Sequence, residues 1–185
     1  MDTKDAPELH TIWDEARNHV ESGNYDKAIE IYRYILIRYG EDDFAAERAN
    51  AYLCSIFCRL QQVDLAEDYI KKAISHSPKK PGYHYILGFF YSFKQQWGKA
   101  IPELEIAVNK EPDKGEYLRE LGWVVYNSGD QERGLAYLHE ANRLAPTDTN
   151  TLAYLALSYL STGDISKAKE YIESALRLDP EESVA

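Results

Sequence analysis

The side chains that most often carry catalysis or bind metals share no recognisable spacing in this sequence. The two cysteines, Cys54 and Cys58, stand four residues apart, which places both thiols on neighbouring turns of one helix. No histidine or further cysteine is spaced to complete a zinc site with them, so both are expected to stay unpaired. His84 fills a packing position and is expected to be a partly buried core histidine. The five histidines are His10, His19, His76, His84 and His139.

Motifs that would organise such residues into an active site are also missing from the sequence. There is no glycine-rich phosphate loop, no His-Glu-x-x-His pair and no nucleophile elbow. We therefore predict no catalytic residue, no metal site and no cofactor, and we expect that the protein is not an enzyme.

The charge balance narrows the choice of partners. The chain carries 21 lysines and arginines against 31 aspartates and glutamates, a net charge of −10 with neutral histidines. Binding of nucleic acid phosphates needs clustered basic side chains, so no nucleic acid partner is expected. No run approaches 18 apolar residues and the N-terminus lacks the features of a signal peptide, so no membrane insertion is expected. Two unpaired cysteines fit a cytoplasmic location.

The strongest pattern in the sequence is a repeat with a period of 34 residues. Prolines, leucines, alanines and small residues each recur at this interval. A period of this length indicates stacked helical pairs, because one such unit cannot bury its apolar face alone. The recurring residues include Pro78, Pro112, Pro146 and Pro180; Leu53, Leu87, Leu121 and Leu155; and Ala73, Ala107, Ala141 and Ala175.

The repeat divides the chain into five units that together form a single array over residues 1–185. The first junction holds four extra residues, about one helical turn, and Asp42 there is a good N-cap. We therefore expect one extra turn at the start of the third helix, and we expect Gly40 to end the helix before it. The units cover residues 9–42, 47–80, 81–114, 115–148 and 149–182, after a short tail at 1–8.

Each unit is expected to hold two helices with a turn between them. Three units place Gly followed by Asn or Asp at this turn, at 23–24, 129–130 and 163–164. The other two place Gln61 and Gln95 there, at a cost of about 1 kcal/mol for a left-handed turn without glycine. Pro102 is expected to be tolerated as one of the first residues of a helix, where N–H groups have no internal partner. Gly122→Phe is expected to overpack the helix interface and uncouple unit four from unit three.

These positions resemble the tetratricopeptide repeat over nearly the whole chain. Unit four supplies Leu118, Leu121, Gly122, Val125, Gly129, Asp130, Gly134, Leu138, Ala141 and Pro146, and unit five supplies Leu152, Leu155, Ala156, Tyr159, Gly163, Asp164, Ala168, Ile172, Ala175 and Pro180. The resemblance implies an all-α fold, a right-handed superhelical solenoid of antiparallel helix pairs with about ten helices. It also implies a concave groove, lined by the first helix of each unit, that binds an extended peptide or a partner protein. The family's carboxylate clamp is absent, since Trp13 and Arg17 stand where its Lys and Asn would be.

Helical spacing selects the residues that would face this groove. In unit four Leu121 and Val125 face the neighbouring helices, so Trp123 faces the groove. Cys58 faces the groove by the same argument. Aromatic and arginine side chains are typical anchors of binding surfaces, and arginine suits a peptide with acidic as well as apolar residues. The candidate peptide-binding residues are Trp13, Arg17, Arg48, Tyr52, Arg59, Tyr85, Phe89, Arg119, Trp123 and Tyr126.

Two structural alternatives compete with this assignment. Phe89, Trp123 and Leu157 occupy equivalent positions and could pack on one another along the groove. Arg17 and Arg119 could instead form ion pairs with nearby glutamates. These glutamates are Glu21, Glu116 and Glu120.

The end of the repeat leaves apolar residues without an expected cover. Ile172, Leu176 and Leu178 lie in the last predicted helix, and the sequence after Pro180 is too short for a further helix. We expect either a longer parent protein or contact of this helix with a second copy or a partner. The leading prediction is a non-catalytic interaction scaffold. The alternatives are a regulatory or targeting segment of a larger enzyme or assembly, and a self-assembling structural protein.

Overall fold

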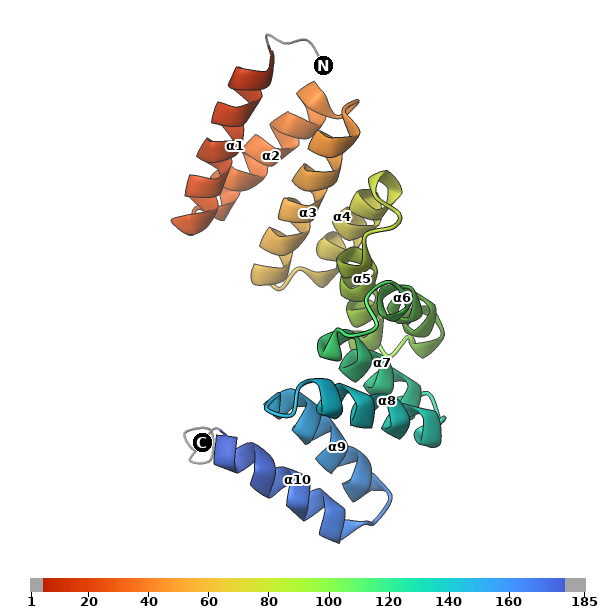
Figure 1. Cartoon of the computed structure of the whole chain (residues 1–185). Helices are drawn as coiled ribbons and strands as arrows, with labels where there is room; N and C mark the ends of the chain where they lie inside the picture. Colours follow the sequence, from red (N-terminus) through yellow and green to blue (C-terminus); the bar gives the residue numbers. More distant parts are fainter. Residues whose placement is uncertain (1–4, 179–185) are drawn as a thin grey trace. The chain divides into compact units, whose positions relative to one another are not determined.

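The structure, a computed structural model, describes residues 5–178, which form ten α-helices and no strand (Figure 1). The prediction of an all-α fold of helix pairs is confirmed. Residues 1–4 and 179–185 lie outside the described residues, and Pro180 is among them. The helices are α1 (Asp5–Glu21), α2 (Tyr25–Tyr39), α3 (Asp43–Arg59), α4 (Val63–His76), α5 (Pro81–Phe93), α6 (Trp97–Lys110), α7 (Gly115–Asn127), α8 (Gln131–Leu144), α9 (Thr149–Ser161) and α10 (Ile165–Leu178).

The chain divides into two compact parts, which are larger than the five repeats and are called unit 1 and unit 2 from here on. Unit 1 ends at Tyr83 and unit 2 begins at His84, so the boundary falls inside α5. In unit 1, α2 packs on both α1 and α3, and α3 packs on α4. The core of unit 1 includes Tyr32, Ile35 and Leu53, which are fully buried. In unit 2, α7 packs on α6, α8 and α9, and α9 packs on α8 and α10.

The extra residues of the first junction lengthen α3, as predicted. The α3 helix has 17 residues where α4 has 14, and Asp42 is its N-cap. The Asp42 carboxylate accepts a hydrogen bond from the Ala45 N–H at 2.9 Å. Gly40 is the C-cap of α2 with φ −69°, a right-handed conformation, so it ends the helix without the left-handed geometry expected of it.

The turns between paired helices use the left-handed backbone that the sequence predicted. Gly23, Gly129 and Gly163 have φ values of 75°, 109° and 81°. Gln61 and Gln95 adopt the same region, at 59° and 55°, although a Cβ is disfavoured there.

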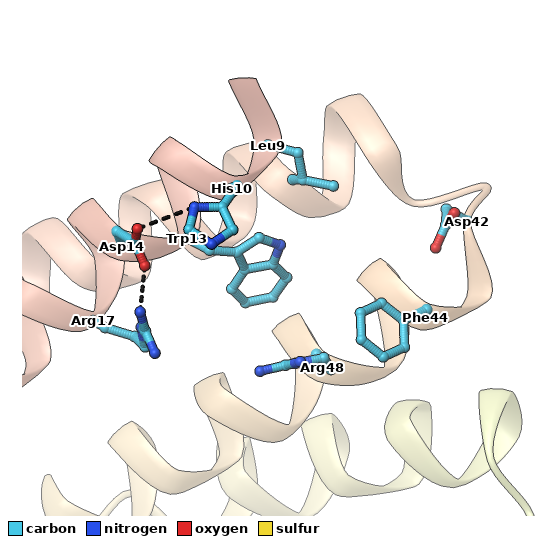
Figure 2. A pocket seen from close by; sticks show the side chains of 8 residues that line it. All are labelled: Leu9, His10, Trp13, Asp14, Arg17, Asp42, Phe44 and Arg48. Carbon is cyan, nitrogen blue, oxygen red and sulfur yellow. Dashed lines mark hydrogen bonds and ion pairs between the residues drawn. The ribbon is translucent and has the colours of Figure 1, made fainter. Parts of the chain in front are cut away.

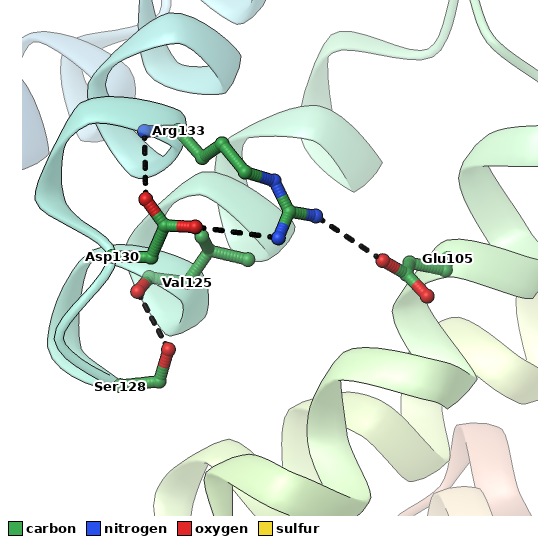
Figure 3. A network of polar contacts seen from close by, with 5 residues as sticks. All are labelled: Glu105, Val125, Ser128, Asp130 and Arg133. Atoms are coloured by element: carbon green, nitrogen blue, oxygen red, sulfur yellow. Dashed lines mark hydrogen bonds and ion pairs between the residues drawn. The ribbon is translucent and has the colours of Figure 1, made fainter.

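The turn before α8 shows how a cap is reinforced (Figure 3). Asp130 accepts a hydrogen bond from the Arg133 N–H at 3.2 Å and pairs with the Arg133 guanidinium at 3.3 Å. The same guanidinium reaches Glu105 of α6 at 3.5 Å, while the Ser128 hydroxyl donates to the Val125 carbonyl at 2.7 Å. Because one arginine contacts a carboxylate from its own turn and one from α6, it ties the start of α8 to the preceding repeat.

Small residues allow close approach of the two helices within a repeat. A Cβ added at Gly122 would lie 2.9 Å from the Leu138 backbone nitrogen and 3.0 Å from the Gly134 carbonyl oxygen. Both neighbours belong to α8, the partner of α7 in the same repeat. The expectation for Gly122→Phe is therefore corrected: the added ring would disrupt repeat four internally, not its junction with the repeat before it.

Pro102 is also placed differently from the expectation. The α6 helix begins at Trp97, and the Ala100 N–H already bonds to the Gln96 carbonyl at 3.0 Å. Pro102 therefore lies past the first turn, and it has no N–H to donate to the Gly98 carbonyl four residues earlier. Gly98 is exposed, so water can take that place.

His84 lies in the core and is buried more completely than the partly buried histidine that was expected. Its exposed fraction is 6%, and its Nδ1 lies 2.6 Å from the Glu103 carboxylate of α6. The pairing compensates the burial of the His84 ring.

Candidate functional site

In unit 1 the first helices of the repeats enclose a hollow of about 450 Å³, which we call the Trp13 hollow (Figure 2). It lies between α1 and α3. Its lining combines apolar and aromatic side chains with charged ones, as in many binding sites. The lining residues are Leu9, His10, Trp13, Asp14, Arg17, Asp42, Phe44 and Arg48.

Trp13 is held in place by two tyrosines. Its ring centroid lies 5.5 Å from that of Tyr32 and 5.8 Å from that of Tyr52, and the two tyrosines stack at 5.0 Å. Tyr32 is fully buried, so it supports the other rings from below the surface. The Trp13 ring therefore keeps one orientation, which suits an anchor in a binding surface.

Arg48 is the cation of the Trp13 hollow that can still pair with an acidic ligand. The Cζ atom of its guanidinium lies 5.6 Å from the Trp13 ring centroid and 5.1 Å from that of Phe44. Figure 2 shows the three side chains together, with Arg17 turned to Asp14, with which it forms an ion pair. Among residues 5–178 no carboxylate pairs with Arg48. A carboxylate from outside the chain could therefore bind there by both charge and forked hydrogen bonds.

A second hollow of about 410 Å³ continues along α3 to the start of α5. On its wall the buried Glu47 carboxylate accepts hydrogen bonds from Lys80, at 2.8 Å, and from the Tyr83 hydroxyl. Burial alone would raise the pKa of Glu47, but these hydrogen bonds outweigh it and the net pKa is lowered. We call this the Tyr83 hollow; it is lined by Phe44, Glu47, Arg48, Ala51, Tyr52, Ser55, Lys80 and Tyr83.

In unit 2 the corresponding helices form a hollow of about 610 Å³, the Trp123 hollow. Trp123 stacks on Tyr154 of α9, with ring centroids 4.5 Å apart. Phe89 and Phe93 keep 43% and 71% of their surface exposed. The hollow is lined by Phe89, Ser92, Phe93, Gln95, Trp97, Glu120, Trp123, Asn127 and Tyr154.

Aromatic side chains do pack on one another along the first helices, but the pairs differ from the expected packing of Phe89, Trp123 and Leu157. Trp123 packs on Tyr154, while Leu157 keeps 49% of its surface exposed. Tyr85 stacks on Tyr117 of α7 at 4.8 Å and is only partly exposed. Exposed aromatic surface in unit 2 thus remains chiefly on Phe89 and Phe93.

Two of the candidate groove residues in unit 2 are engaged within the fold. Arg119 pairs with Asp148 at 2.5 Å, and Asp148 is also the N-cap of α9. This partner differs from the glutamates expected as alternatives. Tyr126 is buried, and its hydroxyl donates to the Ser158 carbonyl of α9 at 2.8 Å. Both side chains join α7 to α9, which leaves little of either for a ligand.

The remaining candidate, Arg59, is exposed at the end of α3 and lines none of the three hollows. The free thiol of Cys58 is exposed and that of Cys54 is buried. The structure thus gathers Trp13, Arg17 and Arg48 in one hollow, and Tyr52 lines the next.

Glu120 was not selected as a site residue from the sequence. It is 3% exposed, yet it lines the Trp123 hollow. Burial raises the pKa of its carboxyl group, and a hydrogen bond to Ser92 and the charge on Arg119 act in the opposite direction without cancelling that effect. A usable signal was present, because Glu120, Trp123 and Asn127 are spaced by three and four residues and so share one side of α7.

In the described part of the chain, no helix has the length and hydropathy needed to cross a membrane. Within residues 5–178, no group of three or more His, Cys, Asp or Glu side chains is arranged to hold a metal ion.

Comparison with protein families gives matches over most of the sequence. A family profile described as "Tetratricopeptide repeat" matches residues 14–84 and 93–149, and a second profile with the same description matches residues 150–182. Together they span all ten helices of the structure in whole or in part.

Individual relatives are more distant. A curated protein from Bos taurus, "BBSome complex member BBS4", is 30% identical over 94 residues, which cover 51% of this chain and 18% of that protein. The chain therefore spans less than a fifth of its length. A solved structure of MamA from Desulfovibrio magneticus RS-1 has a TM-score of 0.82 at 16% identity, covering 94% of this chain and 96% of that one. YrrB, described as a TPR protein with an unusual peptide-binding site, has a TM-score of 0.74 at 18% identity over 97% and 93% of the two chains.

Proposed function

The chain belongs to the tetratricopeptide repeat family, and we propose that it is a non-catalytic scaffold that binds a peptide or partner protein on the first helices of its repeats. The observation that carries this proposal is the Trp13 hollow, where a ring fixed by two tyrosines lies beside an unpaired arginine. Such aromatic and arginine anchors supply most of the affinity of typical protein interfaces.

The lining side chains that can still contact a ligand indicate which kind of peptide would bind. The two hollows of unit 1 share Phe44 and Arg48, so an extended segment lying along α3 would contact both. We propose that this segment carries an acidic side chain for Arg48 and an apolar one for the surface of Trp13 and Phe44.

The proposal also covers the repeat organisation and the cellular location. We propose that the five repeats act as one array and that the protein works in the cytoplasm without a nucleic acid partner.

Self-assembly is the second candidate function, because α10 exposes Ile165, Ile172 and Leu176 to the extent of 62%, 40% and 44%. A mass that grows with concentration in sedimentation equilibrium would favour self-assembly, and a constant monomer mass would count against it.

Capture of partners from an extract of the source organism tests the scaffold proposal. The face variant, Arg48→Glu/Phe93→Ala, changes one lining residue in each unit. The control variant, Ile37→Ala/Arg38→Glu, makes matched changes on α2, where Ile37 is 85% exposed. We expect a protein that is retained by the wild type and the control variant and lost from the face variant. Equal retention by all three would remove the first helices as the binding surface.

A further inference from the structure

The Trp123 hollow contains a buried acidic group with no basic partner. Glu120 is the only carboxylate in its lining, and its exposed fraction is 3%. Within residues 5–178 no lysine, arginine or histidine forms an ion pair with it. The nearest basic neighbour in sequence, Arg119, is committed to Asp148 at 2.5 Å. A hydrogen bond with Ser92 and the charge on Arg119 offset only part of the burial of this carboxylate, and a bound cation would supply more.

The rest of the lining is suited to the same kind of ligand. Aromatic rings attract cations over their faces, and Phe89, Phe93 and Trp123 line the hollow together. Asn127 donates its side-chain N–H to the Trp123 carbonyl at 2.7 Å, so its amide oxygen stays available to accept a hydrogen bond. The lining thus offers aromatic faces, one carboxylate and one amide oxygen.

We propose that the Trp123 hollow binds an arginine side chain of the partner peptide, with Glu120 as its counter-ion and the rings around it as stacking surfaces. A guanidinium group is planar, forks onto a carboxylate and is weakly hydrated, so it satisfies the rings and Glu120 at once. Lysine has no plane to stack and is more strongly hydrated, so it is expected to bind more weakly. This inference rests on the proposed function, because it assigns one side chain of the peptide that the scaffold holds.

The two units would then select opposite charges. Arg48 in unit 1 requires an acidic residue, and Glu120 in unit 2 requires a basic one. A peptide with a like charge would be repelled at each hollow, so each unit would select its own side chain.

The test is a titration with N-acetyl-arginine methylamide, followed by NMR of the tryptophan indole N–H signals. Trp97 and Trp123 line the hollow, while Trp13 lies in unit 1 and serves as an internal reference. We expect saturable shifts for Trp97 and Trp123 and none for Trp13. N-acetyl-citrulline methylamide, which has the same shape without the charge, is expected to produce no saturable shift.

Two variants locate the binding. Glu120→Gln keeps the shape of the side chain and is expected to weaken the arginine probe at least about tenfold, while circular dichroism shows retained helix. Phe93→Ala removes a ring that is 71% exposed, so it leaves the fold intact, and it is expected to weaken the probe several-fold. Phe44→Ala, a matched change in unit 1 at a ring that is 62% exposed, is expected to have no effect.

Several results would overturn the inference. They are the absence of saturable shifts with the arginine probe, an equal response to the citrulline probe, and unchanged binding by Glu120→Gln. Each of these is separate from failure of the scaffold proposal, which is judged by partner capture with the face and control variants. A partner lost from the face variant together with a silent arginine probe would leave the scaffold standing and remove only the role of Glu120.

Discussion

Glu120 has a consequence for stability as well as for binding. Its pKa is raised chiefly by burial above the ordinary value of 4.5, so the folded protein holds this proton more tightly than the unfolded chain does. Stability from such a group is present below the ordinary pKa and is lost as the pH rises through the folded-state pKa. Above the ordinary pKa the burial of this carboxyl group therefore lowers the free energy of unfolding, which is typical of a residue kept for a site.

The predicted result is that Glu120→Gln raises the free energy of unfolding at pH 8, by roughly 1 kcal/mol, the usual scale for a poorly compensated buried polar group. The gain should shrink as the pH falls toward 4.5, because the wild-type carboxyl group then takes up its proton. Urea unfolding of both proteins at several pH values measures this difference. A variant that is less stable than the wild type by the same amount at every pH would contradict the argument.

For single residues, the sequence predicted which kinds of side chain line the first helices better than it predicted their contacts within the fold. Helical spacing selected Trp13 and Arg48, and both line the Trp13 hollow. It also selected Arg119 and Tyr126, whose partners on or before α9 lie 29 and 32 residues further along the chain. Periodicity gives the direction of a side chain from its own helix, but it does not show what the neighbouring helix presents to it.

The turns between paired helices carry backbone strain where the residue in the left-handed conformation is not glycine. Gln61 holds a φ of 59°, which favours glycine. We expect Gln61→Gly to stabilise the protein by roughly 0.5–1 kcal/mol, the left-handed penalty less the extra chain entropy of glycine. Thermal or urea unfolding measures the gain. The matched opposite change, Gly163→Gln, should destabilise by a similar amount, since Gly163 has a φ of 81°. A loss of stability in Gln61→Gly would contradict the assignment of strain at this turn.

The close approach of paired helices gives a second prediction at this scale. A Cβ at Gly134 would lie 2.5 Å from the Tyr126 backbone nitrogen, whereas one at Gly98 would meet nothing within 4 Å. Both glycines are helical, so alanine has the same helix-propensity advantage at each. Gly134→Ala is expected to destabilise by about 1–3 kcal/mol and Gly98→Ala to be neutral or stabilising. Equal effects at the two positions in chemical unfolding would show that α7 and α8 are not packed this closely.

At the scale of elements the sequence was most informative. The 34-residue period, the Gly-Asp and Gly-Asn turns and the Asp42 cap located the helices because each depends on local chemistry. Pro102 was placed too early in its helix because no cap residue marks the start of α6: Gln96 makes no side-chain cap hydrogen bond. Where local signals are absent, the boundary is set by packing that the sequence does not display.

For the whole molecule, the repeat predicts a scaffold but leaves the selection of a partner to a few side chains. The unpaired cation of unit 1 and the unpaired carboxylate of unit 2 are the groups through which that selection would act. Assignment of the five repeats to one array stays a prediction. Binding by the first helices is the central proposal, and it is made for each unit taken separately.

The most direct test of that claim is the dissociation constant of a peptide from the captured partner, measured by calorimetry for three proteins. We expect the face variant, Arg48→Glu/Phe93→Ala, to bind at least about tenfold more weakly than the wild type, a change of about 1.4 kcal/mol. The control variant, Ile37→Ala/Arg38→Glu, should bind as the wild type does. An unchanged dissociation constant for the face variant, or an equal loss in the control variant, would contradict binding by the first helices.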